Sequence, residues 1–295
     1  MSVVVIGNAT LDLTYRVARF PDPGETFLCT ERHIGPGGKG LNQAVAAARA
    51  GAQVVLHVPI GQDWLADHLR GALGAEDGLL LAAWIRPALA TDESSIWVAD
   101  TGENMIVSTA DCANSVTPAE AIAALQGAGP GHVLAMQGNL TEATTVAALG
   151  AARAAGVTTV LNPAPVRCTL DPLLGKVDVL VVNRIEAQVL GIGIAPGELP
   201  QVAARLGGAV VVTLGGDTIR YARADGTFGE QPVRAVEPVD TTGAGDAFVG
   251  VLCAALDRGA SLENAVARAA DAGRQAVMTL GALAPAKAVK TVSNS

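Results

Sequence analysis

Short runs of apolar, largely β-branched residues alternate along this chain with longer segments of helical periodicity. Runs of this kind are typical of strands buried on both faces of a sheet. We predict such strands at 3–6, 54–58, 133–136, 158–161, 179–182 and 210–214. Helical periods fill the intervals, notably at 64–73, 118–125, 142–154, 200–206 and 262–280. This order predicts an α/β fold with a mostly parallel central sheet flanked by helices.

Two segments interrupt the alternation, residues 11–34 and 94–108. Each has the pattern of strands joined by turns. The turns are predicted at Pro21-Asp22-Pro23-Gly24 and at Asp100-Thr101-Gly102-Glu103-Asn104, because these residue types favour tight turns. We therefore expect extra strands outside the parallel sheet.

The charge balance limits how this chain can bind anions. Its 295 residues carry a net charge of −8 with a pI near 5.0, which disfavours nucleic-acid partners because these usually need a basic surface. Half of the residues are hydrophobic and 16% are charged, so the chain can bury a large core. Any phosphate must then be bound locally, through backbone N–H groups, Lys39 and a metal ion.

The cysteines and the hydropathy of the sequence indicate the cellular compartment of the protein. The four cysteines are far apart and lack metal-ligand spacing, which fits a reducing cytosol. The N-terminus has no basic region before its apolar residues, and no run approaches the length of a membrane span. We therefore expect a cytoplasmic protein with no membrane partner.

The segment Asp240-Thr241-Thr242-Gly243-Ala244-Gly245-Asp246 joins a phosphate-binding turn to a helix. Its small residues let backbone N–H groups face an anion, and the apolar period over 247–256 predicts that a buried helix begins there. Asp246 in the first turn would stay ionised and could accept a proton from a hydroxyl. Alternatively, Asp246 only stabilises the helix and the glycines form an ordinary turn.

A second glycine-rich stretch, Gly35 to Gly40, precedes a helix that we predict over 44–50. It puts Lys39 and Asn42 beside an exposed loop. Two known phosphate-binding motifs do not fit. The Walker motif would need a glycine at His33 and a hydroxyl at Gly40. The Rossmann motif would need its glycines directly after the first strand, where Gly7-Asn8-Ala9-Thr10 stands.

Both glycine-rich motifs resemble those of the ribokinase family of carbohydrate kinases, in the same order and separation. Further blocks similar to the family are Pro23-Gly24-Glu25-Thr26, Leu161-Asn162-Pro163-Ala164-Pro165, Asn183-Arg184-Ile185-Glu186-Ala187 and Val212-Thr213-Leu214-Gly215. The resemblance implies a ribokinase-like fold in which 11–34 and 94–108 form a β lid over the sugar. Residues 1–10, 35–93 and 109–295 would then form the catalytic body. It also implies a homodimer through the lid.

The resemblance assigns roles to matching positions. Asp246 would be the general base, and the N–H groups of Gly243, Ala244 and Gly245 would stabilise the transferring phosphoryl group of ATP. Asn183 and Glu186 would hold Mg²⁺ through water, although Asn183 could instead be a helix cap. Thr213 and Gly215 would contact the nucleotide, and 273–281 would lie at the adenine.

For the sugar, the resemblance selects Asp12, Gly38, Lys39, Asn42 and Asn139. Two positions depart from ribokinases, which carry Asn near Thr10 and Glu near Asn139. The acceptor could therefore be ribose, another pentose, a hexose or a nucleoside. A non-catalytic sugar or nucleotide sensor on the same fold is the remaining alternative.

A monovalent cation is a further expectation from the resemblance. Asp240 and the backbone near Thr242 would bind K⁺ beside the anion-binding turn. Pro285 stands where the family has a Ser ligand.

Overall fold

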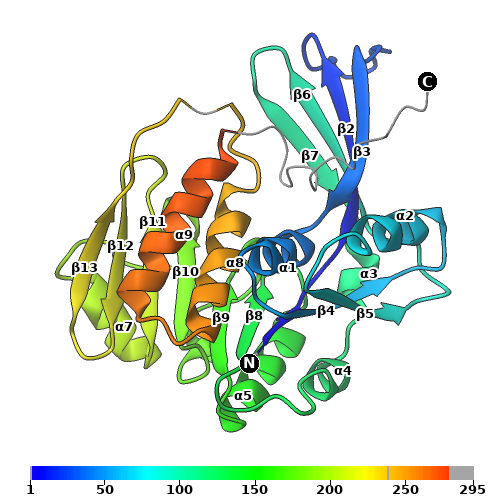
Figure 1. Ribbon diagram of the computed structural model, residues 1–295. Coiled ribbons are helices and arrows are strands. Elements are labelled where there is room, and N and C mark those ends of the chain that lie inside the picture. Colours follow the sequence, from blue (N-terminus) through cyan, green and yellow to red (C-terminus); the bar gives the residue numbers. More distant parts are fainter. Residues whose placement is uncertain (1, 238, 279–295) are drawn as a thin grey trace, which may run out of the picture.

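The computed structural model describes residues 2–237 and 239–278. Its centre is a sheet of nine strands in the order β13-β12-β11-β10-β9-β8-β1-β4-β5 (Figure 1). The strands are β1 (Val3–Ile6), β4 (Val54–Ile60), β5 (Leu79–Ile85), β8 (Val133–Gln137), β9 (Thr158–Asn162), β10 (Val179–Asn183), β11 (Ala209–Thr213), β12 (Thr218–Arg223) and β13 (Phe228–Pro232). Pairing from β5 through β11 is parallel, and β12 and β13 are antiparallel. The predicted mostly parallel sheet is confirmed.

The strands missing from the prediction lie at or near the two edges of this sheet. Strand β5 is composed mainly of Leu and Ala, residues that favour helices at least as much as strands. Strands β12 and β13 carry charged residues such as Arg220 and Glu230, and their side chains are only partly buried. Neither β12 nor β13 contains the continuous apolar run that marks a fully buried strand.

Helices cover both faces of the central sheet. One face is covered by α1 (Lys39–Arg49), α2 (Trp64–Leu73), α8 (Ala244–Asp257) and α9 (Leu262–Ala276). The other is covered by α3 (Asp111–Asn114), α4 (Pro118–Ala123), α5 (Glu142–Ala154), α6 (Arg184–Val189) and α7 (Leu199–Leu206). Successive strand residues alternate between the two cores, as Val3 and Val4 do. Helix α9 ends earlier than predicted, and 279–280 lie outside the described residues.

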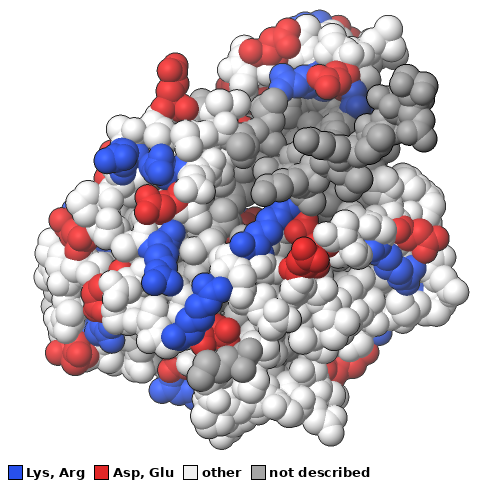
Figure 2. Space-filling view, viewed as in Figure 1, with Lys and Arg blue, Asp and Glu red and all other residues white. Residues whose placement is uncertain are grey.

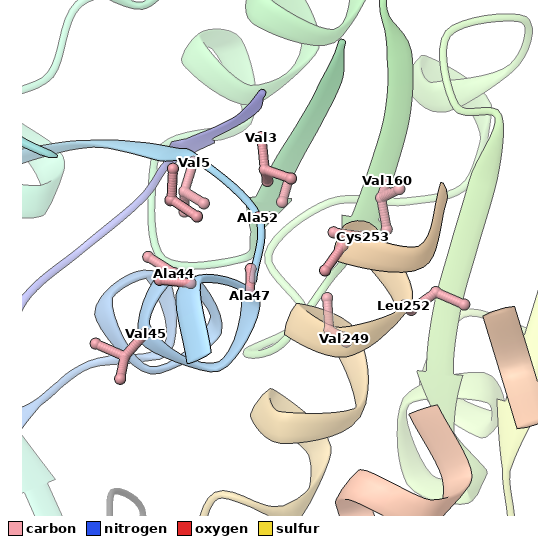
Figure 3. Close-up of a cluster of buried hydrophobic side chains, with 14 of the residues drawn as sticks. Val3, Val5, Ala44, Val45, Ala47, Ala52, Val160, Val249, Leu252 and Cys253 are labelled. Atoms are coloured by element: carbon pink, nitrogen blue, oxygen red, sulfur yellow. The ribbon is translucent and has the colours of Figure 1, made fainter. Parts of the chain in front are cut away.

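Helices α1 and α8 pack against each other and against the strands beneath them. Figure 3 shows Ala47 of α1 and Val249 and Cys253 of α8 in one cluster with Val3 of β1 and Val160 of β9. These side chains are all buried. The shared core fixes the two helices that carry the glycine-rich motifs at their amino ends.

A separate sheet of four strands, in the order β3-β2-β6-β7, stands as a lid beyond the carboxyl ends of the parallel strands (Figure 1). Its strands are β2 (Thr10–Val17), β3 (Glu31–Gly37), β6 (Glu93–Ala99) and β7 (Asn104–Ser108). They come from the two segments in which extra strands were predicted. Strand β3 passes into α1 through Gly38 alone.

Helix α1 begins at Lys39, so the predicted start at Ala44 is wrong. Glycines have poor helix propensity, which made the preceding stretch look like a loop. Gly38 caps the helix with a φ of +93°, and a Cβ there would lie 2.9 Å from the amide nitrogen of Thr10. Asn42 lies inside the helix and is buried, not beside an exposed loop.

The surface carries charges of both signs. Figure 2 shows Lys and Arg interspersed with Asp and Glu over the face of the body seen in that view. The cysteines, Cys29, Cys112, Cys168 and Cys253, are free thiols. Within the described part of the chain, no helix combines the length and hydropathy needed to cross a bilayer.

Candidate active site

A cavity of about 190 Å³ lies where β10 and β11 end and α8 begins. Ligands of open α/β sheets bind at this edge, beyond the carboxyl ends of the strands. Seven of the residues singled out from the sequence line it: Lys39, Asn183, Glu186, Thr213, Gly243, Gly245 and Asp246. The structure therefore brings together the two glycine-rich motifs and the strand-to-helix turn at Asn183.

A larger hollow of about 580 Å³ lies at the opposite edge of the sheet. Its polar side chains have partners within the protein: Arg223 pairs with Glu263, Asp178 accepts from Thr159, and Ser261 caps α9. Groups engaged in this way have little capacity left for a ligand. We therefore take the smaller cavity as the functional site.

Asp246 lies in the first turn of α8, as predicted, and is 5% exposed. Its Oδ1 accepts a hydrogen bond of 3.0 Å from Gln43 Nε2 and lies 3.6 Å from Lys39 Nζ. Its Oδ2 accepts a longer bond of 3.3 Å from Asn42 Nδ2. The carboxylate is thus held by three donors from one helix, α1, at the amino end of another.

The amino end of α8 is arranged to receive an anion. Gly243 caps the helix with a φ of +79°, and no side chain in the described residues caps this end. The first N–H groups of a helix lack intrahelical acceptors and lie at its positive end. Gly243 and Gly245 face the cavity, while Ala244 lies between them at the first helical position.

Three buried amides connect the site, and sequence analysis did not assign them a role. Gln43 Nε2 also donates to Asn162 Oδ1 at 3.3 Å, and Gln137 Nε2 donates to Gln43 Oε1 at 2.8 Å. Gln137 and Asn162 are the last residues of β8 and β9. A polar residue directly after each predicted buried strand, 133–136 and 158–161, was the signal that could have found both.

Asn183 and Glu186 form a reciprocal cap at the start of α6. Asn183 Oδ1 accepts from the Glu186 backbone at 2.8 Å, and Glu186 Oε2 accepts from the Asn183 backbone at 2.9 Å. Asn183 is thus the N-cap of α6, and it lines the cavity as well. Glu186 Oε2 also accepts from Asn162 at 3.4 Å, which joins this turn to Gln43 and Asp246.

The donor set at this turn suits a hydrated magnesium ion. Glu186 Oε1 accepts one hydrogen bond, of 2.8 Å from Asn183 Nδ2, so it can still accept from metal-bound water. Among the described residues, no cluster of three or more His, Cys, Asp or Glu side chains could hold a metal directly. A divalent ion here would be held through water and phosphate oxygens.

The lid contributes Asp12 to a second group of polar residues. Burial raises the pKa of the Asp12 carboxyl, hydrogen bonds from Thr10 and Ser94 lower it, and the charge of Asp246 raises it further. Thr10 Oγ1 donates to Asp12 Oδ1 at 2.9 Å. Asp12 and Asp246 are therefore close enough for their charges to interact.

Two buried amide oxygens stand at positions that the family resemblance assigns to the sugar. Asn42 Oδ1 and Asn139 Oδ1 have no hydrogen-bond partner in the described residues. An unpaired buried acceptor costs about 1–3 kcal/mol. Such a cost in a native structure is explained when a ligand supplies the missing donor.

Of the remaining predicted positions, Asp240 and Gly215 belong to the described residues. Asp240 Oδ1 accepts from the backbone of Thr242 at 2.8 Å, and the Asp240 backbone donates to the Val277 carbonyl at the end of α9. Gly215 turns the chain after β11 with a φ of +73° and lies outside the cavity lining. Pro285 and Gly281 lie outside the described residues.

Comparison with known proteins identifies the class. The model of the pfkB family carbohydrate kinases matches residues 1–288, so the chain belongs to this family. It is an ATP-dependent carbohydrate kinase, a phosphotransferase with an alcohol group as acceptor.

Among its relatives, the chain is similar to a ribokinase of Bacillus subtilis (strain 168), with 31% identity over 282 residues that cover 95% of this chain and 94% of the relative. A ribokinase of Mus musculus is 34% identical over 260 residues, which cover 85% of this chain and 80% of the relative. The crystal structure of a ribokinase from Thermotoga maritima has a TM-score of 0.82 at 28% identity. The match covers 96% of this chain and 94% of that ribokinase. The ribokinase-like fold is therefore confirmed.

Proposed function

We propose that this chain transfers the γ-phosphoryl group of ATP to a hydroxyl of ribose or a related small sugar, with Asp246 as general base. The observation that carries the proposal is the placement of Asp246. It is a buried carboxylate at the positive end of α8, with Lys39 beside it and Asp12 near enough to interact with its charge. The names of the similar relatives favour ribose as the acceptor.

The chemistry follows from this placement. The sugar hydroxyl oxygen bonds to the γ-phosphorus while the bond from phosphorus to the leaving oxygen of ADP breaks, and the hydroxyl proton passes to Asp246. Oδ2 is the better placed acceptor, because Oδ1 already has Gln43 and Lys39. N–H groups of Gly243, Ala244 and Gly245 stabilise charge on the transferring group.

On the nucleotide side, Asn183 and Glu186 would hold Mg²⁺ through water. The ion, when bound, neutralises charge on the phosphates. Thr213 lines the cavity, which supports a contact with the nucleotide, and Gly215 follows in the turn after β11. Thr241, which had no predicted role, lines the cavity as well.

On the sugar side, Asp12 accepts hydrogen bonds from sugar hydroxyls, and Asn42 and Asn139 supply buried amide oxygens. Gly38 is the N-cap of α1 and Lys39 is its first residue, so both lie one turn before Asn42. We propose that residues 11–34 and 94–108 act as a lid that excludes water from the sugar, over a body of 1–10, 35–93 and 109–295.

The decisive experiment measures ADP release with ATP and Mg²⁺ over a panel of pentoses, hexoses and nucleosides. Sugar-dependent release that is highest for ribose or a related sugar is the expected result. Highest turnover with a nucleoside would replace the proposal by a nucleoside kinase. Binding of sugars without any release of ADP would leave a non-catalytic sensor.

Two further features belong to the proposal. Met105, Ile106 and Val107 of β7 are exposed apolar residues in succession, which supports a homodimer through the lid. Sedimentation of a single species with the mass of one chain, at micromolar concentration, would exclude that dimer.

The free thiols fit the expected reducing cytosol, which fractionation of the native host cells would test.

A further inference from the structure

We infer that Gln43 is a positioning residue for Asp246. Its side-chain amide holds Oδ1 of the carboxylate, so that Oδ2 is presented to the acceptor hydroxyl, and Gln137 fixes the direction in which that amide points. The inference rests on the proposed function, because it takes Asp246 as the base.

The orientation of the Gln43 amide is determined by its neighbours. Asn162 Nδ2 donates to the backbone carbonyl of Val181 at 3.0 Å, and a carbonyl can only accept. Asn162 therefore turns its Oδ1 toward Gln43, where it accepts at 3.3 Å. The Gln43 nitrogen lies between this oxygen and Asp246 Oδ1, and it has one N–H for each.

The reversed amide would be strongly disfavoured. It would place the Gln43 oxygen against both Asp246 Oδ1 and Asn162 Oδ1, with no proton between any of them. Gln137 adds to this preference from the other side, since its Nε2 donates to Gln43 Oε1 at 2.8 Å. Gln137 thus donates to Gln43, which donates to Asp246.

Both glutamines are enclosed by protein. Gln43 and Gln137 are each 1% exposed, whereas the neighbouring Lys39 side chain is 39% exposed. Neither glutamine is among the residues that line the cavity. Gln43 must therefore influence the reaction through Asp246 and not through substrate binding.

The two helix backbones hold Gln43 at a fixed distance from Asp246. A Cβ on Gly250 of α8 would lie 2.4 Å from the backbone oxygen of Gln43, so the helices touch one turn beyond Asp246. The cluster drawn in Figure 3 continues this contact through Ala47 and Val249. The Gln43 amide is held by packing as well as by hydrogen bonds.

A hydrogen bond donated to a carboxylate stabilises its ionised form. Removing the Gln43 donor should therefore favour protonation of the base and free its carboxylate to rotate. Both effects reduce turnover, and the first does so most at low pH.

The test compares Gln43→Leu and Gln137→Met with the unaltered enzyme, using steady-state kinetics over a range of pH. For Gln43→Leu we expect kcat to fall about tenfold, with the acid limb of the kcat profile moved to higher pH. The KM values for sugar and ATP should change by less than about threefold. Gln137→Met should move the same limb in the same direction by less, because Asn162 and Asp246 still orient the Gln43 amide, which loses only the donor to its oxygen. Gln126→Leu, at an exposed position, is the matched control.

The outcomes separate this inference from the proposed function. An unmoved acid limb in Gln43→Leu, or a change confined to KM, overturns the positioning role while Asp246→Asn still abolishes turnover. Full turnover by Asp246→Asn overturns the base and the positioning role together. If thermal unfolding shows that Gln43→Leu does not fold, Gln137→Met decides: a moved limb supports the role and an unmoved limb overturns it.

Discussion

Lys39 Nζ lies 3.6 Å from Asp246 Oδ1 and joins the two glycine-rich motifs of the chain across one ion pair. The ammonium is partly exposed and the carboxylate is buried. Partly exposed pairs of this kind contribute little to folding stability. The functional consequence is larger, because Lys39 brings a positive charge to the cavity of a protein whose net charge is −8.

Asp246→Asn should bind ATP and sugar nearly as the unaltered enzyme does and lose turnover by a factor on the order of 10² or more. The amide keeps the size of the side chain but cannot take a proton from the hydroxyl. Calorimetry gives the binding, and an ADP-release assay gives the rate. Asp67→Asn, at an exposed position of α2, is the matched control and should leave both unchanged. Wild-type turnover by Asp246→Asn would contradict the base assignment.

The KM for the sugar should rise at low pH because of Asp12. Burial raises the pKa of this carboxyl above its ordinary value of 3.8, so it becomes protonated earlier than an exposed aspartate as the pH falls. A protonated Asp12 is a weaker acceptor of hydrogen bonds from the sugar hydroxyls. Asp12→Ala should weaken every accepted sugar strongly, and Asp12→Asn should lose the pH dependence of KM. A pH-independent KM, or an unchanged kcat/KM in Asp12→Ala, would move the sugar site elsewhere.

The raised pKa of Asp12 also makes the free energy of unfolding depend on pH. Low pH weakens sugar binding through Asp12 but favours the folded state. Because the folded state raises the pKa of Asp12, it binds the proton more tightly than the unfolded chain does. The contribution of Asp12 to the free energy of unfolding is therefore more favourable below its unfolded pKa and declines as the pH rises through the folded one. Comparing urea unfolding of Asp12→Asn and the unaltered protein at several pH values measures this term.

Asn139→Glu should shift the preference among sugars toward ribose by about tenfold in kcat/KM. Asn139 Oδ1 is buried without a partner, and its backbone oxygen accepts a bond of 2.8 Å from Arg167, which fixes the turn. A carboxylate there accepts from two adjacent hydroxyls, as the ribokinase resemblance implies. The ranking of a sugar panel is the measurement, and Asn139→Ala separates a lost contact from a new one. An unchanged ranking would place Asn139 outside the sugar site.

Potassium should raise the rate severalfold over sodium or Tris at constant Mg²⁺. The Asp240 carboxylate binds the backbone of Thr242 directly before the anion-binding turn, so a cation there would order the N–H groups of that turn. Asp240→Ala should remove the potassium effect. Equal rates in potassium-free buffer would leave Asp240 with a structural role.

The sequence predicted the parallel sheet and the position of Asp246, because both depend on local pattern. Hydrophobic runs mark buried strands, and small residues followed by an apolar period mark the start of α8. The strand-to-helix turn at Asn183 was found in the same way.

The network of amides could not be predicted, since it depends on contacts between distant segments. Nothing near Gln43 in the chain indicates that it meets Gln137 and Asn162, which end two different strands. Helix α1 was placed too late because Gly38 supplies its cap through backbone conformation, which residue propensities do not report. Strand β5 was missed because its Leu and Ala fit either structure.

Strand β3 of the lid enters helix α1 of the body through one residue, Gly38. A connection of this length cannot absorb a change in register, so an added or deleted residue would rotate the first turn of α1 by about 100° and turn Lys39 and Asn42 away from the cavity. The turn between β6 and β7, at the far end of the lid, carries no such constraint. The protein can therefore vary in length at the tip of its lid, while the junction at Gly38 must keep its length for the enzyme to act.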